Sequence, residues 1–360
     1  MKASADPQEP IERLAARLSA RPRTWLVTGV AGFIGSHLAE NLLRAGQKVV
    51  GLDNFSTGKP ENINYLKNNL NEKNRHAFHF IEGDIRSLDA CREACRSAEI
   101  VLHQAALGSV PRSIDDPIAS SDSNVTGFLN MLVAARDSGV ARFVYASSSA
   151  VYGDDPNLPK VEQTIGRAMS PYGLTKRVNE LQADVFAACY GFEAIGLRYF
   201  NVFGPRQDPN GAYAAVIPAF ISSLILEKTT YINGDGTAGR DFCYIDNVVQ
   251  ANLLAATVED PAAVNQAYNI AVGDQTSLTE LYDIVKRLLA PRFPQLRNAR
   301  PVHREPRRGD LRFSRADISK AQQLLGYRAA YRITEGLERA IDWYVANLQP
   351  AEQERKVAHA

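Results

Sequence analysis

The sequence has little cysteine, no long apolar run and almost no excess of either charge. Its 360 residues include four cysteines, and no nearby histidine completes a metal-ligand set around Cys91 and Cys95. We therefore expect free thiols, no metal and a reducing, cytoplasmic compartment. No stretch approaches the ~18 consecutive apolar residues of a membrane span. The net charge of +1 gives no electrostatic reason to expect nucleic acid or an anionic membrane as a partner.

The composition is that of a globular protein, with 45% hydrophobic and 22% charged residues. The chain is long enough for one large domain or two coupled domains. Residues 1–22 lack the apolar core of a signal peptide. Within them, Ile11, Leu14 and Leu18 have helical spacing, which predicts a short amphipathic helix that lies against the body.

A glycine motif follows the first predicted strand. The apolar run 24–28 ends at Gly29, and Gly32 and Gly35 come before a helical segment. Strand, glycine turn and helix together indicate a dinucleotide site. Gly29 permits the tight turn, Gly32 lets a pyrophosphate approach the backbone, and Gly35 lets helix and strand pack closely. The helix N-terminus favours the phosphates.

An acidic residue, Asp53, ends the second predicted strand, 47–52. A carboxylate at this position accepts both ribose hydroxyls and repels a 2′-phosphate, which favours NAD over NADP. Further strands are predicted over residues 76–81, 99–103, 142–147 and 194–199. Their alternation with helices predicts an α/β fold with a doubly wound parallel sheet, in which ligands bind at the carboxyl ends of the strands.

Tyr172 lies four residues before Lys176, and a helix places both on one face. A neighbouring ammonium is expected to lower the pKa of the phenol. With a hydroxyl from the serines at 147–149, the pair would form a proton-transfer unit for an alcohol or sugar hydroxyl. The spacing alone also fits an ordinary surface helix. The dinucleotide motif upstream favours the catalytic interpretation.

These motifs, in this order, resemble the extended short-chain dehydrogenase/reductase family, and within it the nucleotide-sugar 4-epimerases. The resemblance covers roughly residues 23–348 and extends to segments 83–85, 103–106, 199–205, 240–242 and 307–310. It implies a Rossmann-type doubly wound parallel sheet with a smaller mixed α/β substrate-binding domain. The expected division is an N-terminal helical extension (1–22), an NAD-binding domain (23–200 plus 240–275), a nucleotide-sugar-binding domain (201–239 plus 276–348) and a tail (349–360).

The resemblance also implies a reaction with tightly held NAD that is not consumed. Tyr172 would take the O4 proton while the C4 hydride leaves, and the 4-keto sugar would rotate and receive the hydride on its other face. Lys176 would hold the nicotinamide ribose, and Ser148 would hydrogen-bond the reacting hydroxyl. Ser149 could share that contact, and strand alternation decides between the two serines. Dehydration is not expected, because Ser149 and Ala150 stand where the related dehydratases carry an acidic pair.

The implied binding residues form two sets. The NAD set is Gly29, Gly32, Phe33, Ile34, Gly35, Asp53, Asn54, Phe55, Ser56, Thr57, Gly58, Asp84, Ile85, Gln104, Ala105, Ala106, Asn124, Tyr172, Lys176 and Tyr199. The substrate set is Ser109, Ser148, Ser149, Tyr172, Asn201, Val216, Tyr231, Asn233, Arg240, Arg307, Asp310 and Ser314. In the substrate set, the two arginines match phosphate-binding positions, Asp310 matches a ribose-binding acid, and Tyr231 and Asn233 lie near the uracil position.

Ser314 bears on the choice of sugar. Relatives restricted to plain hexoses carry a bulky tyrosine at this position, so a serine leaves room for an N-acetyl group. Segment 106–113 is similar to that of epimerases that prefer acetylated substrates. We therefore expect interconversion of UDP-GlcNAc and UDP-GalNAc, which would supply precursors for surface polysaccharide. UDP-glucose/UDP-galactose and UDP-N-acetylhexosaminuronic acids remain alternatives.

Two rival classes are a non-catalytic NAD-binding regulator and a nucleotide-sugar reductase or dehydrogenase with net redox change. The presence of both Tyr172 and Lys176 argues against the regulator. Family members commonly dimerise through two long helices. The resemblance therefore implies a homodimer formed by the helix at 117–138 and the helix that carries Tyr172.

Overall fold

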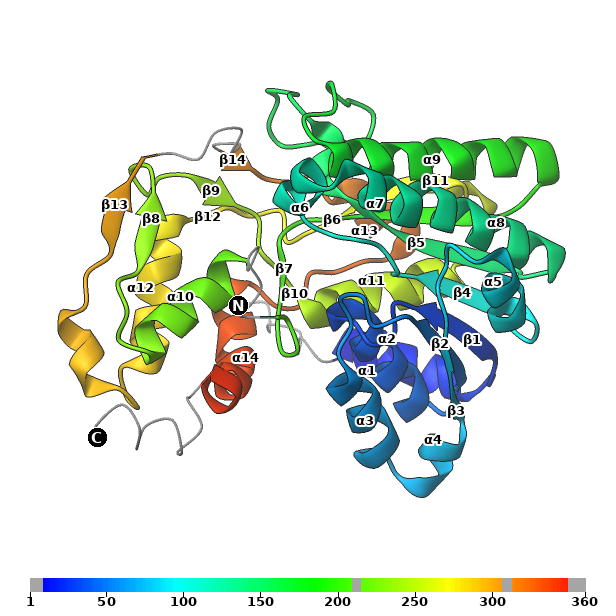
Figure 1. Cartoon of the computed structure of the whole chain (residues 1–360), viewed down its shortest axis with the longest axis horizontal. Helices are drawn as coiled ribbons and strands as arrows, with labels where there is room; N and C mark the ends of the chain where they lie inside the picture. Colours follow the sequence, from blue (N-terminus) through cyan, green and yellow to red (C-terminus); the bar gives the residue numbers. More distant parts are fainter. Residues whose placement is uncertain (1–8, 209–214, 306–312, 349–360) are drawn as a thin grey trace, which may run out of the picture.

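The computed structural model describes residues 9–208, 215–305 and 313–348. Its centre is a seven-stranded sheet in which every neighbouring pair of strands is parallel, in the order β11-β6-β5-β4-β1-β2-β3 (Figure 1). The strands are β1 (Thr24–Thr28), β2 (Lys48–Asp53), β3 (Phe78–Glu82), β4 (Ile100–His103), β5 (Arg142–Ser148), β6 (Ala194–Tyr199) and β11 (Gln266–Ile270). The Rossmann-type doubly wound sheet expected from the sequence is confirmed.

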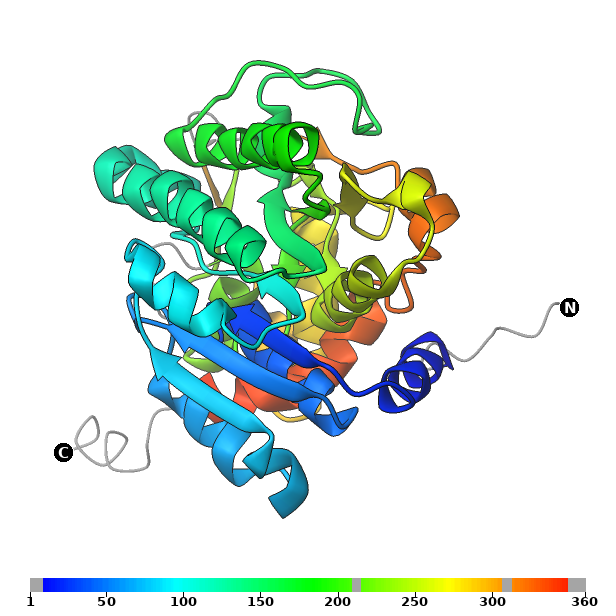
Figure 2. The ribbon, with the colours of Figure 1, turned by 90° about the vertical axis from the view of Figure 1, so that its right-hand side faces the viewer.

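Helices cover both faces of this sheet, which is why its central strands are almost continuously apolar. One face packs against α5 (Leu88–Cys95), α8 (Gly127–Asp137) and α9 (Pro171–Tyr190). The other packs against α2 (Phe33–Arg44), α3 (Pro60–Asn68) and α11 (Ile245–Thr257) (Figures 1 and 2). Near the first face, α6 (Val110–Asp115) and α7 (Pro117–Ser121) lead through a short π-helical segment, η1 (Asp122–Thr126), into α8.

A smaller unit lies beside the sheet, on the left of Figure 1. It contains helices α10 (Val216–Ile225), α12 (Leu278–Leu289) and α14 (Ile333–Leu348). Short strands accompany them: β8 (Tyr231–Asn233) pairs with β13 (Val302–Arg304), and β9 (Gly239–Arg240) lies between β12 (Thr276–Ser277) and β14 (Phe313–Ser314). The chain passes between the two units through β7 (Val202–Phe203) and β10 (Cys243–Tyr244), which pair with each other.

The remaining elements are short. They are α4 (Glu72–His76), α13 (Ser319–Leu325) and the 3-10 segments η2 (Ser149–Tyr152), η3 (Pro261–Ala263) and η4 (Pro294–Asn298). The N-terminal helix α1 (Glu9–Ser19) buries Leu14 and Leu18 against the body, and the Gln47 amide donates to the Leu18 carbonyl at 2.8 Å. Within the described residues, no helix is both long and apolar enough to cross a membrane.

Candidate active site

The glycine turn between β1 and α2 adopts a conformation that requires glycine. Gly29 has φ +67°, and a Cβ on it would lie 2.8 Å from the backbone nitrogen of Ala105. A Cβ on Gly35 would lie 2.1 Å from the Gly29 carbonyl oxygen. Gly32 is the N-cap of α2 and provides no side-chain cap. The first N–H groups of α2 are therefore available to an anion.

Asp53, at the carboxyl end of β2, is buried beside this turn. Its two oxygens accept the Ala31 and Phe55 amides, at 2.9 and 2.8 Å. Burial raises the pKa of its carboxyl above the ordinary value, against the lowering effect of these hydrogen bonds. A buried carboxylate next to a helix N-terminus is the arrangement that holds the ribose of a dinucleotide.

A cavity of about 400 Å³ opens at the carboxyl ends of the central strands. Most of the residues expected to contact NAD lie in its wall: Gly29, Gly32, Phe33, Ile34, Gly35, Asp53, Asn54, Ser56, Thr57, Ile85, Gln104, Ala105, Ala106, Tyr172, Lys176 and Tyr199. The wall also contains residues that were not expected: Leu52, Gly83, Gly108, Ser123, Ala146, Ser147 and Val202. The rule that ligands lie at strand carboxyl ends could have predicted four of these wall residues, namely Leu52, Gly83, Ala146 and Ser147. Ser123 had no sequence signal.

Four residues expected to contact NAD lie outside the wall. The Phe55 ring packs on Phe80, and Gly58 lies against the Asp53 carboxylate. Asp84 pairs with Arg86 at 2.7 Å, and hydrogen bonds from Arg86 lower the pKa of this carboxyl to about 2.

The fourth of these residues, Asn124 in η1, is buried, and its side-chain amide bonds neighbouring groups of the protein. Its Oδ1 accepts the Leu107 amide at 2.7 Å, and its Nδ2 donates to the Leu107 carbonyl and to the Thr175 hydroxyl. This side chain therefore joins the loop after β4 to helix α9.

Helix α9 carries the proposed acid–base residues. Ser170 caps it by accepting the Gly173 amide at 3.0 Å, and Pro171 occupies its first turn. The Lys176 ammonium lies 5.9 Å from the centre of the Tyr172 ring and donates to the Ala146 carbonyl at 2.9 Å. Burial lowers the pKa of Lys176 to about 8.

The expectation that the Tyr172 phenol has a lowered pKa is wrong for this structure. Burial raises the pKa of Tyr172 above its ordinary value, and a hydrogen bond with Ser148 opposes the rise without cancelling it. The ammonium of Lys176 is bound to a backbone carbonyl instead of the phenol oxygen. Desolvation of the phenolate therefore decides the direction of the shift.

Strand alternation separates the three serines. The Ser147 hydroxyl faces away from the cavity and donates to Glu180 at 2.6 Å. Ser148 lies in the cavity wall with Tyr172 and accepts the Ala150 amide at 3.1 Å. Ser149 lies in the wall of neither this cavity nor the cavity that adjoins it at Asn201 and Val202. The hydroxyl that meets the phenol is thus that of Ser148.

A second cavity, of about 470 Å³, adjoins the first, and both include Asn201 and Val202. Its wall contains four more of the residues expected to contact substrate, Val216, Tyr231, Asn233 and Arg240, together with Arg304, which the sequence did not single out. The Arg304 guanidinium lies 5.0 Å from the Tyr231 ring centre and donates to Asn233 at 2.6 Å. The joined cavities could hold two long polar ligands end to end.

The remaining residues expected to contact substrate are placed differently. Ser109 has φ +92° and caps α6, and it lies outside both cavity walls. Ser314 on β14 is paired with Arg240 on β9, is 9% exposed and also lies outside both walls. Arg307 and Asp310 lie outside the described residues.

The chain is similar to a known protein family and to proteins of known structure. Residues 25–271 match the model of the NAD dependent epimerase/dehydratase family. A UDP-glucose 4-epimerase of Mycolicibacterium smegmatis is 36% identical over 89% of this chain and 97% of its own length.

Two solved structures are similar along most of their length. The UDP-N-acetylglucosamine 4-epimerase of Methanobrevibacter ruminantium, in complex with UDP-N-acetylmuramic acid, gives a TM-score of 0.82 at 34% identity. That match covers 90% of this chain and 99% of the other. The UDP-glucuronic acid 4-epimerase of Bacillus cereus, in complex with UDP-glucuronic acid and NAD, gives a TM-score of 0.80 at 30% identity. That match covers 91% of this chain and 100% of the other.

Proposed function

This chain belongs to the NAD dependent epimerase/dehydratase family, and we propose that it inverts C4 of a UDP-sugar, with UDP-N-acetylhexosamines as the preferred substrates. The observation that carries the reaction is the placement of Tyr172, Lys176 and Ser148 together in the wall of the cavity that the glycine turn also lines. The family and the buried Asp53 beside the glycine turn support NAD as its cofactor.

The residues divide the work in a simple way. When bound, NAD accepts and returns the hydride at C4. The glycine turn and the α2 N-terminus would hold its pyrophosphate, and Asp53 would hold a ribose. Tyr172 takes the proton from the sugar O4 and later returns it, while the Ser148 hydroxyl orients the same oxygen. Lys176, whose ammonium donates to the Ala146 carbonyl at 2.9 Å and lies 5.9 Å from the centre of the Tyr172 ring, would hold the nicotinamide ribose.

The second cavity is suited to the nucleotide half of the substrate. Arg240 in its wall suits a diphosphate, because one guanidinium group can donate two parallel hydrogen bonds to phosphate oxygens. Tyr231, which is stacked with Arg304, offers a flat surface to a pyrimidine ring. The junction at Asn201 then lies between the nucleotide and the reacting sugar.

We infer a preference for acetylated sugars from the small side chain of Ser314, which is paired with Arg240 of the second cavity. We expect UDP-GlcNAc to turn over faster than UDP-glucose or the acetylated uronic acid when a UDP-sugar panel is separated by chromatography. A Ser314→Tyr variant should lose about 10–200-fold on UDP-GlcNAc, as expected for a pocket too small for its substrate, with little change on UDP-glucose.

The matched control is Ser97→Tyr, at an exposed serine outside both cavity walls, which should change neither rate. A preference for the plain hexose, or a Ser314→Tyr enzyme with full activity on UDP-GlcNAc, contradicts the substrate assignment. Net accumulation of reduced nicotinamide during turnover would instead indicate a dehydrogenase or reductase.

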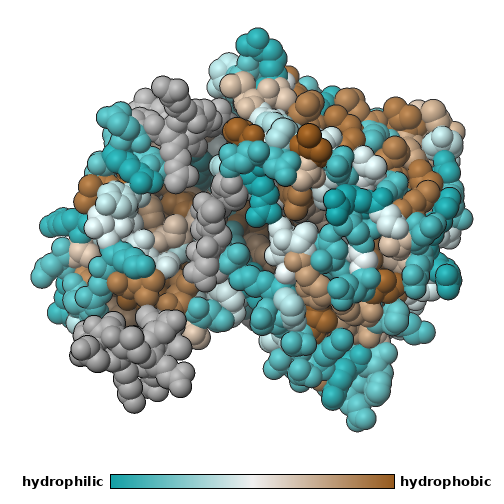
Figure 3. Space-filling view, viewed as in Figure 1, coloured by the Kyte–Doolittle hydropathy of each residue, from teal (hydrophilic) through white to brown (hydrophobic). Residues whose placement is uncertain are grey.

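We also propose a homodimer. Large apolar side chains are exposed over neighbouring helices, Ile114 on α6, Ile118 on α7 and Leu174, Leu181 and Val185 on α9. Ile118 is 74% exposed, and apolar side chains gather over this part of the surface in Figure 3. A second copy with the same apolar face would cover them.

Sedimentation should therefore give a dimer for the wild type and a monomer for Leu181→Asp/Val185→Asp. The control is Leu158→Asp, an exposed leucine outside these helices, which should remain dimeric. A monomeric wild type would exclude this assembly.

A further inference from the structure

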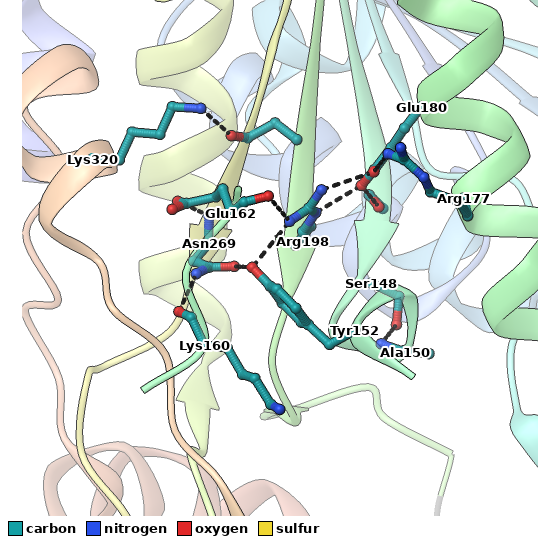
Figure 4. Close-up of polar contacts among 12 residues, drawn as sticks. Ser148, Ala150, Tyr152, Lys160, Glu162, Arg177, Glu180, Arg198, Asn269 and Lys320 are labelled. Carbon is teal, nitrogen blue, oxygen red and sulfur yellow. Dashed lines mark hydrogen bonds and ion pairs between the residues drawn. The ribbon is translucent and has the colours of Figure 1, made fainter. Parts of the chain in front are cut away.

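A row of polar residues crosses the sheet beneath α9, one residue before the cavity. Ser147 on β5 is opposite Arg198 on β6, and Arg198 is opposite Asn269 on β11. The next pair along the same strands, Ser148 and Tyr199, lies in the cavity wall. Because side chains alternate along strands, the row points towards α9, where Glu180 bonds both Ser147 and Arg198, whereas Ser148 and Tyr199 point to the other face of the sheet. Figure 4 shows Arg198 at its centre.

Arg198 joins two structural elements that border the active site. Its Nε and Nη2 donate to the two Glu180 oxygens at 2.8 and 2.9 Å, and Glu180 is on α9. Its Nη1 donates to the Tyr152 hydroxyl and to the Glu162 carbonyl, both at 3.0 Å. Tyr152 ends the 3-10 turn that Ser148 caps, and its hydroxyl donates to Asn269 at 2.6 Å.

Arg198 and Glu180 form a buried ion pair. The side chains of Arg198 and Glu180 are 3% and 4% exposed. Burial by itself would raise the pKa of Glu180, yet the bonds from Arg198 hold it below the ordinary value. Such a buried bidentate pair has little freedom to reorient.

Glu180 continues the face of α9 that carries the acid–base residues, because positions 172, 176 and 180 lie one turn apart. Two of them bond β5 directly: Lys176 donates to the Ala146 carbonyl, and Glu180 accepts the Ser147 hydroxyl. The third, Tyr172, shares the cavity wall with Ser148, the last residue of β5. Arg198 on β6 bonds Glu180 and so ties α9 to this strand as well. Arg198 also bonds Tyr152 and so holds the 3-10 turn that follows Ser148.

We propose that Glu180 and Arg198 are positioning residues that set the distance between the Ser148 hydroxyl and the Tyr172 phenol. This inference rests on the proposed function for its kinetic consequence. Neither residue lies in the wall of either cavity, and the pair acts through helix α9 and the 3-10 turn. A displacement of about 1 Å at a reacting group can cost on the order of 10²-fold in rate.

The test compares Glu180→Gln and Arg198→Lys with the wild type. Both variants should lower kcat for UDP-GlcNAc about 10–100-fold with KM nearly unchanged, since the substrate contacts stay in place. The pKa of Tyr172 should rise, because the Ser148 hydrogen bond that lowers it is lengthened. This pKa is measured by ultraviolet titration, with the same protein carrying Tyr172→Phe as the blank.

Two controls separate positioning from plain stability. Arg177→Gln removes the outer, half-exposed partner of Glu180 and should leave kcat and the Tyr172 pKa unchanged. Phe186→Leu weakens the apolar packing of α9 and should lower Tm with the same two quantities unchanged. If the single variants fail to fold, the neutral pair Glu180→Leu/Arg198→Met is used, since such replacements often restore folding.

The neutral pair should fold and still show low kcat and a raised Tyr172 pKa. Variants of the pair with lower Tm but wild-type kcat and Tyr172 pKa would overturn the inference. The titration separates this result from a failure of the proposed function. A wild type that epimerises no UDP-sugar disproves the function, whereas an unchanged Tyr172 titration in Glu180→Gln disproves the positioning role.

Discussion

Tyr172→Phe is expected to lower kcat for UDP-GlcNAc by about 10²–10⁴-fold, the usual contribution of a positioned general acid–base group. The phenol oxygen is the group that meets Ser148 in the cavity wall, and the ring of phenylalanine keeps the shape without the proton acceptor. KM and the bound NAD content should stay close to wild type, because the glycine turn and Asp53 are untouched.

The control for this variant is Tyr190→Phe, at the other end of α9, where the ring is 55% exposed. It removes the same atom from the same helix and should leave kcat unchanged. Initial rates give kcat and KM, and the absorbance of bound nicotinamide gives the NAD content. Wild-type turnover in Tyr172→Phe would remove Tyr172 from the mechanism.

Gly35→Ala should yield a protein that has lost bound NAD and with it nearly all activity. The new Cβ would lie 2.1 Å from the Gly29 carbonyl oxygen and 2.7 Å from its carbon, and both are backbone atoms that cannot move aside. Overpacking of this kind costs about 1–3 kcal/mol or more of unfolding free energy. It also opens the turn that would receive the pyrophosphate. The NAD-to-protein ratio and Tm are the measurements.

Gly139→Ala is the matched control. Gly139 also has a positive φ, +71°, but a Cβ there meets nothing within 4 Å, and the residue lies in the turn after α8. The left-handed backbone costs an alanine about 1–2 kcal/mol. Tm should fall while NAD and activity remain. A Gly35→Ala enzyme that keeps its NAD would mean that the dinucleotide does not bind at this turn.

The parts of the site that follow from local patterns could be predicted from the sequence. A strand, a glycine turn and a helix dictate the conformation at Gly29 and Gly35, and the end of the next strand places Asp53 beside them. Likewise, helical spacing puts Tyr172 and Lys176 on one face. The sequence left open the choice between Ser148 and Ser149. In the structure β5 ends at Ser148, which lies with Tyr172 in the cavity wall, whereas Ser149 begins a 3-10 turn outside it.

Features that depend on distant segments could not be predicted. Arg304 reaches the second cavity only because β13 pairs with β8, and no local pattern signals that pairing. Strand β11 carries Gln266, Tyr268 and Asn269 and lacks the apolar run of the other strands. The raised pKa of Tyr172 is a result of burial, which the spacing to Lys176 does not reveal.

The most direct test of the central claim is the deuterium content at C4 of the product formed in D₂O. If Tyr172 handles only the O4 proton and the hydrogen at carbon travels to bound NAD and back, the product will carry no deuterium at C4. Deuterium from solvent at that carbon would contradict hydride transfer and, with it, the role assigned to the site.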